Sequence, residues 1–451
     1  MMMRKVALLA LGLAVVSPVA VRAQVPGNCP GPGCPLAFVI PTLYGQSGLK
    51  VESQALLPDG SNHSAHFNSA FQAEFTLFNT SLASQLASVP LPSPASGFTY
   101  ELDPALGVMK RSTQSFGPIF AERAETIGRK KFSLGVNYQR FSFDTIEGID
   151  LTAVPAVFTH DGAAPGGKAD VVSTMNSISL GVDQFTAFLS YGVTDFLDFS
   201  VAVPLVRVDM SVTSNAAIER IGTASNPKIH FFSDPAAAGG YGNAKTFSST
   251  GNASGIGDLV LRLKGTAIKS GHTGLALAVD VRLPTGDEKN FLGSGAAGVK
   301  PFLAFSFAAG RVSPHLNFGY QWNGKSLLAG NILTGEKQSL PNQYLYAVGA
   351  DIGIASKLTL AFDVLGRRVI NSPRLQSQTF SPLQSFTFPG GGSTLPDIRF
   401  STSSFNITNG AVGLKLNAGG NLLIDLNGIF KLDDAGLRAK FTPLFGVEYS
   451  F

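Results

Sequence analysis

Alternating apolar and polar side chains are clearest at the end of the chain, in residues 437–451. One parity carries Leu437, Ala439, Phe441, Pro443, Phe445, Val447, Tyr449 and Phe451. The other parity is polar or small apart from Leu444. Because successive side chains of a strand point to opposite faces, this pattern predicts a strand with one apolar and one polar face. Such a strand fits the wall of a transmembrane β-barrel, whose apolar side chains face lipid and whose other side chains face the lumen.

The same two-residue period begins at Lys131 and predicts twelve strands. We expect them near residues 131–143, 171–191, 197–205, 256–267, 273–285, 297–309, 315–323, 342–352, 358–364, 412–417, 422–427 and 437–451. We assign the apolar parity of each strand to the outside, so that Ile178, Leu180 and Val182 face lipid and Asp183 faces the lumen. An even number of strands is typical of single-chain bacterial barrels.

The predicted connections between these strands alternate in length. Short turns are expected near residues 192–195, 268–272, 310–312, 354–356 and 418–420. Longer loops are expected near residues 144–170, 211–255, 286–296, 324–341, 371–407 and 432–436. Outer-membrane barrels have short periplasmic turns and longer extracellular loops. The fold class that we predict is therefore all-β: a transmembrane antiparallel barrel over residues 131–451, with its C-terminus in the periplasm.

The composition agrees with a barrel and disfavours other classes. Charged residues make up 14% of the 451 residues, well below the roughly 25% of soluble domains. Beyond the N-terminus no apolar run reaches the roughly 18 residues that indicate a transmembrane helix. The net charge of +4 is small for this length, so we expect no nucleic-acid partner.

The first 23 residues have the pattern of a signal peptide. Arg4 and Lys5 precede an apolar stretch at residues 6–16, and residues 21–23 form an approximate small-x-small cleavage site. An apolar stretch of about 11 residues is short for a membrane anchor. We therefore expect a mature, exported chain that begins at Gln24 and lies in the outer membrane of a Gram-negative cell.

Residues 24–130 lack the sustained two-residue period. Residues 69–86 carry apolar side chains at helical spacing, including Phe75, Phe78 and Leu82. We interpret 24–130 as a segment that plugs the barrel or extends into the periplasm. Its two cysteines, Cys29 and Cys34, are close enough in sequence for a small disulfide loop, which would add little stability.

Charged residues are frequent on the parity that we assign to the lumen. The candidates for lining it are Asp183, Asp198, Arg262, Asp280, Arg282, Lys300, Asp363, Arg367, Asp425 and Glu448. Basic residues dominate toward the expected extracellular side, and acidic residues dominate toward the periplasmic side. One interpretation is an electrostatic field that attracts anionic solutes. The other is a set of cross-strand salt bridges that packs a narrow lumen.

Aromatic residues near strand ends are candidates for the two membrane rims. They are Tyr320, Trp322, Tyr344, Tyr346, Tyr449 and Phe451. Aromatic girdles of this kind flank the apolar band of outer-membrane barrels.

Catalysis is not indicated by the sequence. Of the histidines, His315 alone lies on a predicted strand, facing inward, and no Ser/His/acid or metal-ligand set can be identified. We expect no enzyme activity, no cofactor and no metal.

Three stretches resemble an outer-membrane family linked to the MetA pathway of phenol degradation, whose members are often labelled transporters. They are 191–206 (YGVTDFLDFSVAVPLV), 283–295 (LPTGDEKNFLGSG) and 120–143, which contains AERAETIG before the first strand. The resemblance covers roughly residues 121–451. It implies an outer-membrane barrel that passes aromatic or hydrophobic compounds.

The leading functional hypothesis is therefore passage of small solutes, hydrophobic or aromatic ones included, through a porin-like barrel. The alternative is a structural or adhesive barrel that acts through its extracellular loops. The partners expected are outer-membrane lipid, the barrel-assembly machinery and a small-molecule solute.

Overall fold

The computed structural model describes residues 34–45, 48–56, 60, 66–68, 75–87, 97–103, 108–111, 114–160, 170–223, 226–382, 387–388 and 391–451. The expected signal peptide and Cys29 lie outside these residues. Cys34 is disulfide-bonded, and the sequence contains two cysteines.

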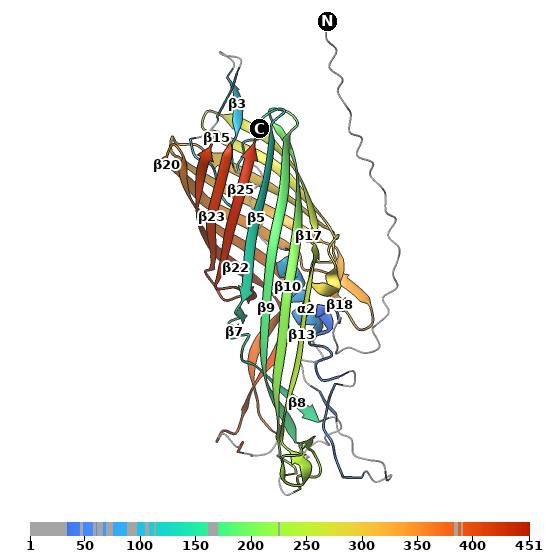
Figure 1. Ribbon diagram of the computed structural model, residues 1–451. Helices are drawn as coiled ribbons and strands as arrows, with labels where there is room; N and C mark the ends of the chain where they lie inside the picture. The colour runs from blue at the N-terminus through green and yellow to red at the C-terminus, as the bar shows by residue number, and fades with distance from the viewer. Residues whose placement is uncertain are drawn as a thin grey trace.

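Twelve strands of the described residues form a closed antiparallel barrel (Figure 1). In wall order they are β5 (Phe132–Phe143), β9 (Val171–Gly192), β10 (Leu197–Glu219), β14 (Leu259–Ser270), β15 (Thr273–Leu283), β16 (Gly298–Phe307), β17 (Val312–Asn323), β20 (Gln343–Ala355), β21 (Leu358–Phe380), β22 (Leu395–Gly419), β23 (Leu422–Lys431) and β25 (Phe441–Ser450). Pairing of β25 with β5 closes the wall, for example at Val447 and Val136. The predicted fold class is confirmed.

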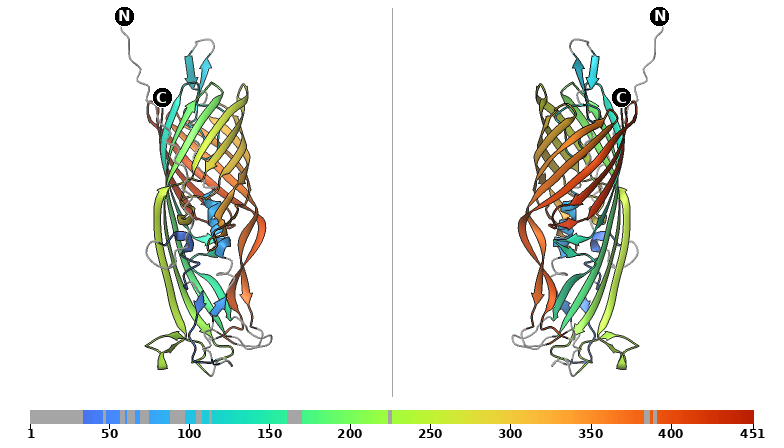
Figure 2. Two further views of the ribbon diagram at one scale, coloured as in Figure 1. Left: turned by 90° about the vertical axis from the view of Figure 1, so that its right-hand side faces the viewer. Right: turned by 90° about the vertical axis from the view of Figure 1, so that its left-hand side faces the viewer.

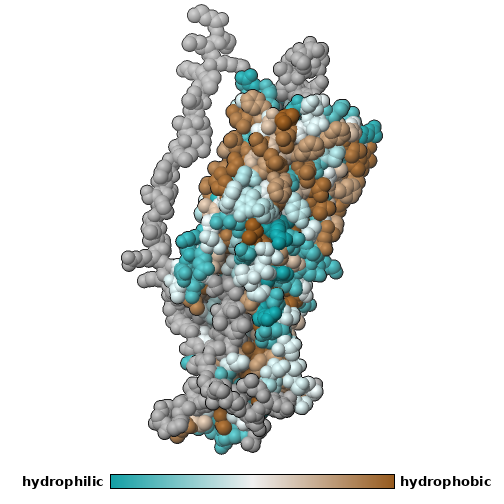
Figure 3. Space-filling view, turned by 180° about the vertical axis from the view of Figure 1, so that it is seen from behind, coloured by the Kyte–Doolittle hydropathy of each residue, from teal (hydrophilic) through white to brown (hydrophobic). Residues whose placement is uncertain are grey.

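The C-terminus and the short turns lie at one end of the barrel, which we call the turn end. Apolar side chains face outward around the half of the molecule on this side. Exposed examples from five strands are Leu134, Leu189, Leu277, Phe318 and Phe445. Figure 3 shows the belt as a brown zone over the upper part of the molecule, with mostly hydrophilic or pale residues below it. A belt of this kind is the surface that a barrel presents to lipid.

The far end differs from the sequence prediction, because much of the chain expected to form loops is β-structure. β9, β10, β21 and β22 have 22, 23, 23 and 25 residues, more than a bilayer requires. β13 (Ala244–Ile256) pairs with the outer part of β10. The predicted loops 211–255 and 371–407 are therefore wrong over much of their length.

Shorter elements lie in the predicted loops, and one of them occupies residues 437–438 of the strand predicted at 437–451. They are β6 (Thr145–Ile146), β7 (Ile149–Asp150), β8 (Val154–His160), β11 (Phe232–Ser233), η2 (Ala238–Gly240), β12 (Tyr241–Gly242), η3 (Glu288–Asn290), β18 (Lys325–Asn331), β19 (Glu336–Ser339) and β24 (Leu437–Arg438). β8 pairs along β9. Figure 2 shows the extended strands projecting beyond the barrel on two sides, with N-terminal elements between them.

The side-chain pattern inverts where these strands leave the barrel. In β10 the outward parity is apolar up to Leu205 and polar from Arg207 onward. The inward positions change from polar to apolar at the same point, and the inward side chains Val206 and Val208 are buried. The parity itself continues without a bulge along the β9–β10 pairing. The chemistry therefore indicates two environments: lipid outside the barrel, and water outside the extension around an apolar core.

This inversion corrects one candidate lumen residue. Asp183 is on the outward parity of β9, together with the exposed Phe185. Its carboxylate pairs with the guanidinium of Arg140 at 3.0 Å and accepts a hydrogen bond from the Tyr138 hydroxyl at 2.6 Å. Leu180 and its neighbours Ile178 and Val182 are buried in the core of the extension. Assigning every apolar parity to the lipid side was wrong here, because this part of β9 lies beyond the belt.

The extension and the N-terminal segment together form a structure that we call the head. It comprises the described residues between 34 and 87, β8, β13 and the parts of β9, β10, β21 and β22 beyond the belt. The N-terminal elements are η1 (Leu36–Phe38), β1 (Leu49–Lys50), β2 (His66–Asn68) and α2 (Phe75–Leu86). Leu36, Phe38, Phe78 and Leu82 are buried against the inward residues of the extended strands. The helix predicted at 69–86 is observed from Phe75.

Several buried polar groups of the head are hydrogen-bonded. The Tyr44 hydroxyl lies 2.8 Å from Ser214 Oγ and 3.2 Å from Asn176 Oδ1, and burial raises the pKa of Tyr44 to about 12. Burial would also raise the pKa of Asp170, but hydrogen bonds from His230, Thr223 and two backbone N–H groups outweigh it, so this pKa is lowered. His230 Nδ1 lies 2.6 Å from Asp170 Oδ2.

After α2 the chain is next described at the opposite, turn end of the molecule. There β3 (Tyr100–Asp103) and β4 (Val108–Arg111) form a hairpin beyond the rim (Figure 1). Residues 114–127 then run inside the barrel and lead into β5. No helix among the described residues is long and apolar enough to cross a membrane.

Candidate functional site in the lumen

Residues 114–127, which we call the plug strand, occupy the lumen near the turn end. Their backbone N–H groups donate to side chains of the wall. Phe116 N donates to Thr359 Oγ1 at 2.9 Å, and Ala124 N to Ser306 Oγ at 2.6 Å. Asp363 accepts from two consecutive N–H groups, each at 3.3 Å. Since buried backbone donors need partners, the inward polar residues of the wall satisfy the plug strand.

A buried charge cluster joins the plug strand to β14, β15 and β16. Glu122 of the plug strand accepts from Lys264 Nζ at 2.9 Å and also pairs with Arg262. Arg262 Nε lies 2.7 Å from Asp280 Oδ1, and Lys300 Nζ lies 2.7 Å from Asp280 Oδ2. Arg262 and Lys300 therefore share one wall carboxylate, and Glu122 supplies the second.

A second cluster holds the plug strand on the adjacent part of the wall, formed by β17, β20 and β21. The guanidinium of Arg123, which is 1% exposed, lies 2.9 Å from Asp351 and donates to Ser115 Oγ at 2.8 Å. His315 lies between two carboxylates: its Nε2 is 2.7 Å from Asp363 and its Nδ1 is 3.4 Å from Asp351. Together these contacts fix residues 115–123 across the lumen.

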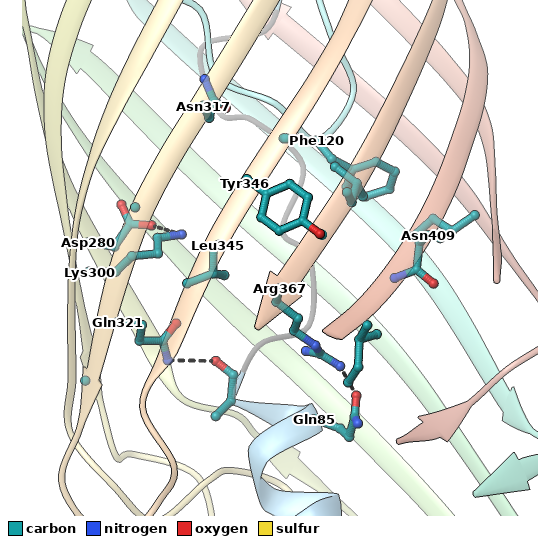
Figure 4. A pocket seen from close by; sticks show the side chains of 18 of the residues that line it. Gln85, Phe120, Asp280, Lys300, Asn317, Gln321, Leu345, Tyr346, Arg367 and Asn409 are labelled. Atoms are coloured by element: carbon teal, nitrogen blue, oxygen red, sulfur yellow. Dashed lines mark hydrogen bonds and ion pairs between the residues drawn. The ribbon is translucent and has the colours of Figure 1, made fainter. Parts of the chain in front are cut away.

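A cavity of about 230 Å³ lies between the plug strand and the C-terminal end of α2. Phe120 of the plug strand and Gln85 of α2 are at its two ends (Figure 4). Apolar side chains form much of its wall: Phe141, Phe143, Val182, Val260, Phe302, Leu345, Leu365, Ile407, Ile429 and Leu437. Its charged lining residues are Glu122, Arg262, Asp280, Arg282, Lys300, Arg367 and Arg438. The site is therefore amphipathic.

Three of these cations, Arg282, Arg367 and Arg438, lie outside the charge cluster and donate to uncharged oxygens. Arg282 donates to the carbonyl of Ala87 at 2.7 Å and to Asn323 Oδ1 at 2.8 Å. Arg367 donates to Gln85 Oε1, as Figure 4 shows. Arg438 donates to the carbonyl of Thr408 at 2.7 Å and to Asn409 Oδ1 at 2.8 Å.

The structure separates the predicted lumen residues into groups. Arg262, Asp280, Arg282, Lys300 and Arg367 line the cavity. Asp198 and Asp363 bind backbone N–H groups of the plug strand. Asp425 and Glu448 lie on the inner wall away from the cavity, where Glu448 accepts from Ser133 Oγ at 2.6 Å. Asp183 lies outside, as described above.

The candidate rim aromatics form contacts at both ends of the belt. Tyr320 packs edge-on against Trp322 and Tyr344, with ring centroids 4.7 and 4.8 Å apart. At the turn end the rings of Tyr449 and Phe451 are 5.9 Å apart. A side chain at Gly366 would collide with the Tyr346 ring, so Tyr346 packs over the neighbouring strand.

Sequence reasoning missed the residues that the plug strand contributes. Glu122, Arg123 and Phe120 were not candidates, because their segment has no strand or helix period. A charged pair followed by Ala124-Glu125 in an otherwise small and apolar stretch was the one local signal. No group of three or more His, Cys, Asp or Glu residues in the described part of the chain could hold a metal ion.

One family model matches part of the chain. Residues 156–347 match the model of the family described as "Putative MetA-pathway of phenol degradation". The resemblance seen in the sequence is confirmed. No curated protein matches the chain.

Several solved structures are similar to this chain at low identity. The COG4313 outer membrane channel from Pseudomonas putida F1 is 15% identical, with a TM-score of 0.42 over 73% of this chain and 98% of that one. A Pseudomonas aeruginosa FadL homologue is 12% identical, with a TM-score of 0.31 over 82% and 96%. The P. putida toluene transporter TodX is 12% identical, with a TM-score of 0.29 over 71% and 89%.

Proposed function

We propose that the protein is an outer-membrane channel that passes small, partly apolar solutes. The observation that carries this proposal is the amphipathic cavity inside a closed barrel, between α2 and the plug strand. Pockets that combine an apolar lining with a few polar groups are typical of small-molecule sites. The outward apolar belt and its aromatic contacts support placement in the outer membrane, with the turn end in the periplasm.

In this proposal the head is extracellular and the plug strand closes the periplasmic side of the cavity. A solute first enters between the elements of the head and then occupies the cavity beside Phe120. It leaves when contacts such as those of Glu122 and Arg123 with the wall are rearranged. The N-terminal segment is thus a plug, and the rest of the chain from residue 131 is the barrel.

Uptake by cells whose outer membrane lacks its general porins tests this function. Cells that produce the protein should accumulate ring-labelled benzamide and benzoate faster than cells that carry an empty vector. A matched variant with Phe120 replaced by Trp, which fills the cavity, should lower the rate. Equal uptake by all three strains would refute the channel.

The alternative, an adhesive or structural barrel, is separated by the same strains. An adhesin depends on the surface of the head, and filling an internal cavity leaves that surface unchanged. Cell-surface binding that is lost on proteolysis of the head, together with unchanged uptake, would favour the adhesive function.

A further inference from the structure

We propose that the lumen cavity selects monoanions with an apolar body, such as aromatic carboxylates, and binds their negative group with Arg367 and its neighbours Arg282 and Arg438. This inference rests on the proposed channel function and names its substrate class. The cavity combines arginines on the side that faces α2 with an apolar wall.

The positive charge of these three arginines is not balanced by the carboxylates that line the cavity. Glu122 and Asp280 are the acidic residues among the described lining residues, and both are paired with Arg262, Lys264 or Lys300. The charge cluster is therefore internally compensated. The three arginines contribute additional positive charge on the side of the cavity that faces α2.

The nearest carboxylates outside the lining are already used by other donors. Asp258 lies 3.7 Å from Arg282 and accepts from Ser294 N at 2.8 Å and Ser294 Oγ at 2.6 Å. Asp433 lies 3.8 Å from Arg438 and accepts from Thr408 N at 2.6 Å. Neither lines the cavity. A ligand carboxylate in the cavity can therefore offer these guanidiniums direct charge-assisted hydrogen bonds, which are shorter than the 3.7 and 3.8 Å contacts with Asp258 and Asp433.

The apolar wall suits the remainder of such a ligand. Phe120 and Leu345 border the cavity together with Arg367 (Figure 4), and Leu365 also lines it. An apolar cavity of about 150 Å³ holds benzene, so about 230 Å³ accommodates one ring with a small charged substituent. Arg367 also lies at the α2 side, where its contact with Gln85 must be exchanged for the ligand.

Benzoate and benzamide are the probes for this inference, because they have nearly the same shape and differ in charge. Binding to the purified full-length protein in detergent is measured by isothermal titration calorimetry. The wild type should bind benzoate more tightly than benzamide. Arg367→Gln should weaken benzoate binding roughly tenfold or more, since one hydrogen bond to a charged group is lost, and should leave benzamide binding nearly unchanged.

Arg368→Gln is the matched control. Arg368 is the next residue of β21, on the opposite face, where it contacts Asn406 Oδ1 at 3.4 Å. This variant should keep the preference for benzoate. Equal affinity of the wild type for benzoate and benzamide would overturn the inference. This comparison needs no variant, so the inference can be tested even if Arg367→Gln does not fold. Loss of the preference in both variants would also overturn it.

Uptake by porin-deficient cells separates this inference from the channel function. Entry of both probes at equal rates, with equal affinities, overturns the anion site and leaves the channel standing. Preferential binding of benzoate without entry of either probe supports the anion site and overturns the channel. Preferential entry of benzoate that Arg367→Gln abolishes and Arg368→Gln preserves supports both.

Discussion

Replacement of Glu122 by Gln should open the channel. Glu122 belongs to a buried cluster in which it, Asp280 and Asp198 face Arg262, Lys264 and Lys300. The amide of Gln is nearly the same size but carries no charge. The variant therefore leaves one unbalanced positive charge beside the plug strand, chiefly on Lys264, whose side chain is 1% exposed.

The magnitude follows from the cost of an unpaired buried charge, about 3–5 kcal/mol. This cost applies while the plug strand is seated. It falls when the strand moves away and water reaches Lys264 Nζ. The equilibrium between closed and open states should then shift by a factor of roughly 150 to 5,000. A wild-type channel that is open about 1% of the time would become mostly open.

Single-channel recording in planar bilayers measures this shift directly. Glu122→Gln should show frequent openings where the wild type shows few. The double variant Glu122→Gln, Lys264→Met removes the unbalanced charge and should return the open fraction toward the wild-type value. Asp209→Asn is the control, because it breaks an exposed pair with Arg207, which is worth at most about 1 kcal/mol. Unchanged gating in Glu122→Gln would refute the role of the cluster.

Three further predictions concern the wall and the head. Deletion of Phe451 removes its backbone pairing with Phe132 and the contact between their rings at 5.5 Å. The amount of assembled, heat-modifiable barrel on gels should therefore decrease, while the conductance of the assembled fraction stays the same. Asp170→Asn should destabilise the head at neutral pH, and its difference from the wild type should shrink in acid. The pKa of Asp170 is lowered in the folded head, so the ionised carboxylate stabilises the fold above the unfolded pKa of about 3.9, and this stabilisation is lost as the pH falls through the folded pKa. Protease resistance over a series of pH values from neutral downward measures this loss. Arg207→Cys on intact cells should react with a membrane-impermeant maleimide whereas Val208→Cys should not, since Val208 is 0% exposed; the reverse result would contradict the assignment of faces.

The barrel was predictable because each wall strand repeats a simple local pattern. In β17, for example, Leu316 and Phe318 alternate with His315 and Asn317, and the structure places the first pair outward. The alternation of short and long connections added an independent constraint. Together they were enough for the strand number and for closure of the barrel.

The plug strand was not predictable in this way. Its N–H groups are satisfied by side chains such as Thr359 and Ser306, which are 243 and 182 residues away in sequence. Such contacts leave no period in residues 114–127. The cavity could not be predicted either, because it exists only where α2 and the plug strand, held by different parts of the wall, approach each other.

The head was missed although the sequence contains its signal. Residues 206–212 continue the two-residue period of the strand, but the apolar positions change parity between Leu205 and Val206. We interpreted that change as the end of a strand. The structure shows that it is the point at which one continuous strand passes from lipid to water.

The change of parity occurs at the same height on three neighbouring strands. This height therefore marks the membrane boundary. Arg140 of β5 is directly opposite Asp183 of β9, which is in turn opposite Arg207 of β10. All three are the first outward charges after an apolar run on their strands. A single strand could invert its pattern by chance, but three hydrogen-bonded strands that invert at one level require a common physical cause. The boundary of the lipid is such a cause, and it places the head wholly in the water beyond it.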